Sequence, residues 1–312
     1  MILDLTVLAV AFAASVLLYP TLIRIFQRLR VRQPIQAELS AEHQRKRGTP
    51  TGGGVLFVGV GILGGILATR NHPGALAPTV ALALYGALGL FDDAAKLRFG
   101  SVGIPARIKF PLQILFAIPI VWLATVQQHP IRFDMIHQWY YWPLAVGAVV
   151  GAANAVNLTD GLDGLAGGLA AIAILGTTFL LPGAGFGERA VAMSLAGGVL
   201  AFLVYNRHPA RIFMGDTGAL GLGAALSAMA IQQGWVLLLA GLGLVFAVET
   251  LSVIMQVGYF KATGGRRLFK MTPIHFTFQL EGWSERRIAL AFWSAGVVAA
   301  VASGLIAHSL GV

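Results

Sequence analysis

Ten apolar runs separated by short polar segments make up most of this 312-residue chain and restrict the folds open to it. Hydrophobic residues are 57% of the chain and charged residues only 11%, with a mean hydropathy of +0.77, which soluble domains do not reach. Polypeptide in lipid must satisfy its own backbone hydrogen bonds, and runs near ~20 residues predict helices rather than barrel strands. We therefore predict an all-α polytopic membrane protein, one domain over residues 1–312, with about ten transmembrane helices. The runs are Leu3–Ile25, Gly52–Thr69, Ala75–Phe91, Phe110–Gln127, Trp142–Val156, Leu165–Leu181, Ala190–Tyr205, Thr217–Ile231, Trp235–Phe260 and Ile288–Leu310.

The basic residues give the expected orientation, because Lys and Arg concentrate in cytoplasmic loops. All but three of the 22 Lys and Arg residues fall in odd-numbered connections between the runs; the exceptions are Arg70, Arg132 and Arg189. Both termini are therefore expected outside, and the polar motifs inside. The net charge of +9 fits anionic lipid heads and phosphate substrates, or topology alone, and we expect no nucleic-acid partner. The absence of cysteine excludes disulfides and thiolate metal sites.

Five aspartates stand where apolar runs break off, on the expected cytoplasmic side. They are Asp92, Asp93, Asp160, Asp163 and Asp216. Adjacent carboxylates at Asp92 and Asp93 would repel by roughly 4 kcal/mol at ~4 Å and a dielectric near 20, so a cation is expected beside them. Mg²⁺ and Lys96, one helical turn beyond Asp92, are the candidates. The alternative is a solvated helix end with an ordinary ion pair.

A second motif closes the fifth run and opens the sixth. Asn154, Asn157, Asp160 and Asp163 are spaced by three, so they share a face if helical geometry persists, and they would offer amides and carboxylates to one ligand. In the seventh connection, Asn206 precedes Phe213-Met214-Gly215-Asp216-Thr217-Gly218. Asp216 is either an N-cap or a metal ligand, and Mg²⁺ is the expected ion because hard oxygen ligands predominate.

Two further segments flank these motifs. Lys46 to Gly54 could present cations, hydroxyls and N–H groups to phosphate, although it lacks the P-loop signature. His275, in the ninth connection, can donate hydrogen bonds to a phosphate or uridine, or is simply a satisfied loop residue. Glu249 and Gln256 share a face of the ninth run, which indicates either a groove-lining position or a hydrogen bond between helices.

Together these motifs, from Lys46 to Glu285 and in the same order, resemble the polyprenyl-phosphate N-acetylhexosamine-1-phosphate transferase superfamily and its branch of phospho-N-acetylmuramoyl-pentapeptide transferases. The resemblance implies ten helices, Mg²⁺ dependence, a bacterial inner-membrane location with a cytoplasmic site, and a homodimer. It also implies transfer of phospho-MurNAc-pentapeptide from UDP to undecaprenyl phosphate, which forms lipid I for peptidoglycan and releases UMP. The segment Met271 to Glu285 favours this branch over relatives that use UDP-GlcNAc.

By position, the resemblance implies that Asp92 acts on the lipid phosphate with Asp93 beside it, that Asp216 is the metal ligand, and that His275 belongs to the catalytic group. Residues expected to bind substrate are Lys46, Thr51, Lys96, Lys109, Asn154, Asn157, Asp160, Asp163, Asn206, Phe213 and Gln256. The chain departs from the family at Gly52, Ala219, Phe276, Thr277 and Gln279; Phe276 and Thr277 replace two of three consecutive histidines.

Two rival classes remain open from sequence. An intramembrane aspartyl protease would need glycine where Phe213 stands. An ion-coupled carrier could use Glu249 and Asp216, but carriers often have repeated halves and mid-membrane sites, whereas these polar strips end the runs.

Overall fold

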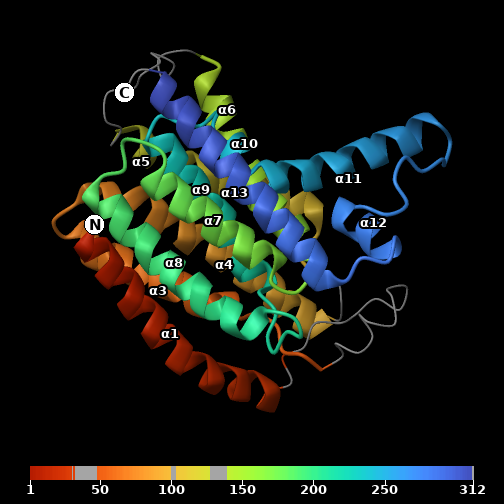
Figure 1. The fold of residues 1–312 in the computed structure, drawn as a ribbon, viewed down its shortest axis with the longest axis horizontal. Helices are drawn as coiled ribbons and strands as arrows, with labels where there is room; N and C mark the ends of the chain where they lie inside the picture. The colour runs from red at the N-terminus through yellow and green to blue at the C-terminus, as the bar shows by residue number, and fades with distance from the viewer. Residues whose placement is uncertain (30, 32–47, 100–102, 127–138, 311–312) are drawn as a thin grey trace.

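The computed structural model describes residues 1–29, 31, 48–99, 103–126 and 139–310, and the elements in these residues are helices (Figure 1). The prediction of an all-α protein is confirmed. The helices are α1 (Ile2–Arg28), α3 (Gly54–Thr69), the short 3₁₀ helix η1 (Pro73–Ala75), α4 (Leu76–Phe99), α5 (Ala106–Val126), α6 (Tyr141–Thr159), α7 (Leu165–Phe179), α8 (Phe186–Asn206), α9 (Gly215–Gln232), α10 (Leu239–Leu242), α11 (Leu244–Ala262), α12 (Ile274–Leu280) and α13 (Glu285–Ser309).

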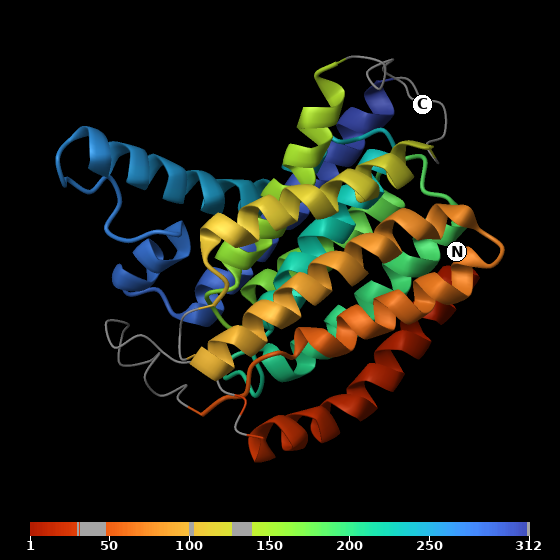
Figure 2. The ribbon, with the colours of Figure 1, turned by 180° about the vertical axis from the view of Figure 1, so that it is seen from behind.

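The apolar runs became the long helices. Within the described residues, seven helices are long and apolar enough to cross a membrane: those that include α1, α4, α5, α6, α8, α11 and α13. Two shorter apolar helices, α3 and α7, correspond to the second and sixth runs. With this many long apolar helices, the protein is a multi-pass membrane protein (Figures 1 and 2).

Three boundaries differ from the prediction. Helix α4 continues eight residues beyond Phe91, and α5 begins at Ala106 rather than Phe110, so the charged residues near these ends are helical. The ninth run, predicted as one helix, is divided between α10 and α11 at Gly243. Because glycine weakens a helix by about 1 kcal/mol relative to alanine, this position favours a break. Beyond it, α11 projects from the bundle and α12 folds back beneath it (Figure 1).

Helix α9 is the centre of the bundle, with buried residues along its whole length from Asp216 to Gln232. Helix α4 lies against it at very close range. A Cβ added to Gly89 would stand 2.3 Å from the carbonyl oxygen of Asp216, so only glycine lets the two backbones meet here. This contact brings the last turns of α4 to the first turn of α9.

At one end of the bundle α4, α6 and α8 terminate and α5, α7, α9 and α13 begin (Figures 1 and 2). It is called here the basic end, because these helix ends and the loops between them carry Lys96, Arg98, Arg107, Lys109, Arg207, Arg211, Arg286 and Arg287. The start of α1 and the end of α13 lie at the opposite end, together with Arg70 and Arg189; Arg189 stands 3.6 Å from Asp4. The predicted cytoplasmic segments and the predicted outside segments therefore lie at opposite ends of the bundle. The five aspartates all lie at the basic end.

Candidate active site

Asp93 joins α4 to α9 by capping the α9 N-terminus. Its carboxylate accepts hydrogen bonds from the backbone N–H groups of Asp216 at 2.9 Å and Thr217 at 3.0 Å, and from the Thr217 hydroxyl at 2.7 Å. First-turn N–H groups have no partner within their own helix, so an anion here satisfies them and the helix dipole together. Asp216 is therefore not the N-cap considered from sequence. Asp93 fixes the backbone from which the Asp216 side chain projects.

Asp92 and Asp216 share two lysines. Lys96 Nζ lies 2.8 Å from Asp92 Oδ2 and 2.7 Å from Asp216 Oδ1. Lys109, from α5, lies 3.5 Å from Asp92 Oδ2 and also contacts Asp216 Oδ2. The predicted pairing of Asp92 with Lys96 along α4 is confirmed, and Lys109 completes a group of two carboxylates and two ammonium groups. These four residues are called the ion cluster below.

The position of Lys109 is secured by the next turn of α5. There Gln113 exchanges hydrogen bonds with Asn154 of α6, at 2.8 Å from Asn154 Nδ2 and 3.3 Å from Gln113 Nε2, and its backbone carbonyl accepts from Tyr85 at 2.6 Å. Asn154, expected to bind substrate, thus links two helices behind the ion cluster.

The predicted polar strip is interrupted. Helix α6 ends at Thr159, before Asp160 and Asp163, so the spacing of three does not continue and the four residues do not share one helical face. Asn157 and Asp160 lie partly exposed at this helix end. Asp163 is buried: its Oδ2 accepts from the backbone N–H of Ala210 at 3.0 Å and lies 3.0 Å from His208 Nδ1.

Asn206 joins two turns at the basic end. Its side-chain oxygen accepts from Gly164 N–H at 2.9 Å, and its amide donates to the carbonyl of Ile212 at 2.8 Å. The next residue, Phe213, donates its N–H to the Pro50 carbonyl at 2.8 Å and accepts from Gly53 N–H at 2.8 Å. The buried Thr51, just before α3, therefore lies beside the partly exposed Phe213. Lys46 lies outside the described residues.

His275, at the start of α12, is fully buried against Glu249 of α11. Its Nδ1 lies 3.1 Å from Glu249 Oε2, and both side chains are 0% exposed. A Cβ added to Gly161 would stand 2.4 Å from His275 Nε2, so the ring faces the turn that carries Asp160. Glu249 thus makes the contact between helices considered from sequence. Gln256 instead holds the following loop, accepting from Leu268 and Phe269 N–H groups at 2.9 Å.

The ion cluster fits a divalent metal by the chemistry of its donors. Both oxygens of Asp216 and one of Asp92 converge on shared cations, and all are hard oxygen ligands. Mg²⁺ is commonly bound through one or two carboxylates with substrate phosphates completing its shell. Two aspartates already balance two lysines, so a bound diphosphate would bring uncompensated negative charge that a cation could neutralise.

Sequence reasoning missed Gln113, His208 and Glu285. The sequence did contain an indication for Gln113, because a polar amide stands inside an apolar run one helical turn beyond Lys109. His208 and Glu285 had none, because Glu285 approaches His208, at 3.6 Å, only through the fold. With Asp163, these two residues offer ligand atoms within 4.8 Å of one another.

A family model and named relatives both match this chain, the relatives over most of its length. Residues 75–234, which carry the ion cluster, match glycosyl transferase family 4. A phospho-N-acetylmuramoyl-pentapeptide-transferase of Desulforamulus reducens is 41% identical over 303 residues, or 91% of this chain and 90% of the relative. Proteins of the same name are 40% identical in Listeria monocytogenes, over 95% of both chains, and 42% identical in Moorella thermoacetica, over 95% of this chain and 96% of the relative. The match spans more than half of the sequence and includes α4, α5 and α9, and the chain therefore belongs to glycosyl transferase family 4.

Proposed function

We propose that the protein transfers phospho-MurNAc-pentapeptide from its UDP derivative to undecaprenyl phosphate, forming lipid I and releasing UMP. Relatives about 40% identical over nearly their whole length carry the name of this enzyme. The observation that supports it most strongly is the ion cluster, where Lys96 and Lys109 join Asp92 to Asp216 at the basic end of a membrane bundle.

The proposed reaction is an in-line attack. An oxygen of the lipid phosphate attacks the β-phosphorus of the UDP-sugar, the bond from that phosphorus to the bridging oxygen breaks, and UMP leaves with that oxygen. Phosphoryl transfer depends mainly on positioning and charge neutralisation. Mg²⁺, when bound at Asp216, would neutralise charge on the diphosphate. Lys96 and Lys109 would exchange part of their contact with the carboxylates for phosphate oxygens.

Asp92 is proposed to orient the attacking phosphate. A phosphate monoester has a second pKa of about 6, so at neutral pH it is largely ionised and needs little help to lose a proton. Asp92 is held by Lys96 and by the backbone N–H of Ile104 at 2.8 Å, which suits a fixed orienting group. Rates of Asp92→Asn between pH 6 and 9 test this role. Wild-type rates at every pH would remove Asp92 from the reaction.

The other groups at this end are proposed to hold the nucleotide, sugar and peptide. Asn157, Asp160, Asp163 and Phe213 would contact the uridine diphosphate, and His275 the sugar phosphate. The family's motif order supports this assignment, as does the position of Asn157, Asp160, Asp163 and Phe213 where α6 ends and α7 and α9 begin, at the same end of the bundle as the ion cluster. The basic end is proposed to face the cytoplasm of a bacterial inner membrane, on the distribution of Lys and Arg. The homodimer stays a prediction.

An exchange assay tests the proposal. Purified protein, Mg²⁺, unlabelled UDP-MurNAc-pentapeptide, undecaprenyl phosphate and radiolabelled UMP should yield labelled UDP-MurNAc-pentapeptide, because the reverse reaction rebuilds the donor. UDP-GlcNAc in place of the muramoyl donor should give no exchange. Exchange with UDP-GlcNAc alone would instead support the related GlcNAc-1-phosphate transferases, and no exchange with either donor would refute the proposal.

A further inference from the structure

A polar pocket, distinct from the ion cluster, lies at the basic end between the end of α8 and the start of α13. Its volume is about 580 Å³. Its polar part includes Arg207 and Arg211 from the loop after α8 and Arg286 from α13, and its apolar wall includes Leu290 and Trp293. Asp163, assigned above to the uridine diphosphate, also lines the pocket, whereas these three arginines, Leu290 and Trp293 belong neither to the ion cluster nor to the groups assigned to the substrates.

The three arginines of this pocket have no acidic partner within the part of the chain that the structure describes. Among the described residues, no carboxylate lies within ion-pair distance of the Arg207, Arg211 or Arg286 guanidinium, whereas Lys270, in the loop before α12, pairs with Glu281 at 3.0 Å. The acidic side chain of the lining, Asp163, is already engaged by His208 and the Ala210 N–H. Three exposed arginines therefore line one cavity without a carboxylate partner among the described residues, which favours an anionic ligand.

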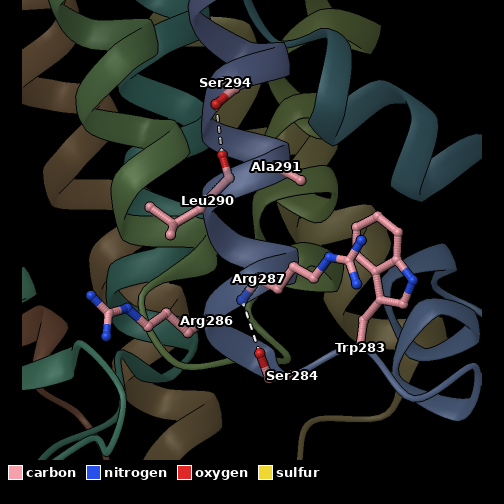
Figure 3. A pocket seen from close by; sticks show the side chains of 7 residues that line it. All are labelled: Trp283, Ser284, Arg286, Arg287, Leu290, Ala291 and Ser294. Carbon is pink, nitrogen blue, oxygen red and sulfur yellow. Dashed lines mark hydrogen bonds between the residues drawn. The ribbon is translucent and has the colours of Figure 1, made fainter.

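The lining of the pocket changes from polar to apolar along α13. Leu290 and Trp293 lie one and two turns along α13 from Arg286, so the apolar wall extends about 10 Å from the arginine along the membrane-spanning helix. Arg286 and Leu290 project from the same side of α13, while Arg287 projects from the other side and stacks over Trp283 at 3.9 Å (Figure 3). A ligand that used the whole pocket would carry its negative charge at one end and a hydrocarbon chain at the other.

We propose that this pocket binds an anionic phospholipid, with its phosphate between Arg207, Arg211 and Arg286 and an acyl chain against Leu290 and Trp293. Guanidinium groups bind phosphate oxygens in pairs, and basic pockets between helices at the cytoplasmic level suit anionic head groups. A carboxylate of a water-soluble peptide would satisfy the arginines but leave the apolar wall unused. Such a lipid bridges α8 and α13, so its binding stabilises the folded protein.

The test compares two triple variants that remove the same charge from the same end of the bundle. The pocket variant is Arg207→Gln, Arg211→Gln and Arg286→Gln. The matched control is Arg24→Gln, Arg28→Gln and Arg287→Gln, exposed arginines that do not line this pocket. The full-length proteins, in neutral detergent, are titrated with phosphatidylglycerol or phosphatidylcholine, and bound lipid is counted by native mass spectrometry alongside the shift in melting temperature. Inorganic phosphate and UDP-MurNAc-pentapeptide serve as competitors.

The proposal predicts at least 10-fold weaker phosphatidylglycerol binding for the pocket variant and less than 2-fold for the control. A variant that restores lysine at all three positions should recover most of the binding, which separates loss of charge from loss of folding. Equal weakening of both glutamine variants, or none in either, would overturn the proposal. So would displacement of the lipid by inorganic phosphate at equal concentration, or a rise in the KM for UDP-MurNAc-pentapeptide with lipid binding unchanged; the last result would assign the pocket to the donor's peptide.

Discussion

The Asp93 carboxylate provides the sharpest test of how the fold builds the ion cluster. It accepts three hydrogen bonds from the first turn of α9, at 2.7, 2.9 and 3.0 Å, and lies in a buried position. In Asp93→Asn the amide keeps one acceptor oxygen, but its NH₂ group faces donors rather than acceptors. With hydrogen bonds to a charged group contributing about 1.5–3 kcal/mol each, the loss of one bond and weakening of the others should cost about 2–4 kcal/mol of unfolding free energy.

A double-mutant cycle isolates this interaction. Unfolding free energies of Asp93→Asn, Thr217→Val and the double variant are measured by SDS titration in mixed micelles, and transfer rates are measured on the same samples. The coupling energy between the two side chains should be about 1 kcal/mol or more, because the Thr217 hydroxyl donates directly to Asp93. Transfer should fall at least ~10-fold, since Asp216 projects from the turn that Asp93 holds.

Asp4→Asn is the matched control for activity, because Asp4 is a buried carboxylate at the opposite end of the bundle, 3.0 Å from the N-terminal amine. It should leave the transfer rate within about 2-fold of wild type. A coupling energy below about 0.5 kcal/mol, or full stability of Asp93→Asn with transfer abolished, would refute the capping role and leave Asp93 as a chemical group only.

Three further perturbations address the ion cluster and its neighbours. Lys109→Met should lower kcat/KM at least ~100-fold, because Lys96 alone then offsets the repulsion between Asp92 and Asp216, and Lys109→Arg should recover part of it. Equal rates for Met and Arg would contradict a role for the charge. Glu249→Ala should lower kcat about 10-fold with the KM of both substrates nearly unchanged, because His275 loses the partner of its Nδ1, and Glu249→Gln should lose less; a change confined to KM would count against positioning of His275. Chelation by EDTA should abolish transfer, and added Mg²⁺ should restore it. The unfolding free energy should change by less than about 1 kcal/mol, because lysines already balance the aspartates. Transfer in the presence of EDTA would exclude a role for the metal.

The sequence predicted the parts of the fold that depend on local pattern. Apolar runs gave the helices, and the spacing of Asp92 and Lys96 gave an ion pair within α4, because residues four apart share a helical face. The break at Gly243 was not predicted, since the residues on both sides of it are equally apolar. Hydropathy records how much of a segment suits lipid, and it carries no information about where a helix bends.

The site depended on contacts that no local pattern encodes. Lys109 reaches Asp216 across 107 residues, and Asp93 caps a helix more than a hundred residues later, so both contacts arise from the close packing of α4 and α5 on α9. Asp163 would share a face with Asn154 only if the helix continued through it, and α6 ends four residues before it. Gln256 was assigned to substrate by resemblance, but its hydrogen bonds hold the loop at Leu268 and Phe269, which only the folded loop reveals.

Identification of the lipid product tests the central claim most directly. Wild type and Asp216→Asn are incubated in detergent with Mg²⁺, undecaprenyl phosphate and UDP-MurNAc-pentapeptide, and the organic phase is analysed by mass spectrometry while released UMP is counted. Wild type should form undecaprenyl-diphospho-MurNAc-pentapeptide and UMP in equal amounts, and Asp216→Asn should form at least ~100-fold less of both. Equal product from the two proteins, or wild-type release of UMP with no diphosphate-linked lipid, would contradict the proposal that transfer takes place at the ion cluster.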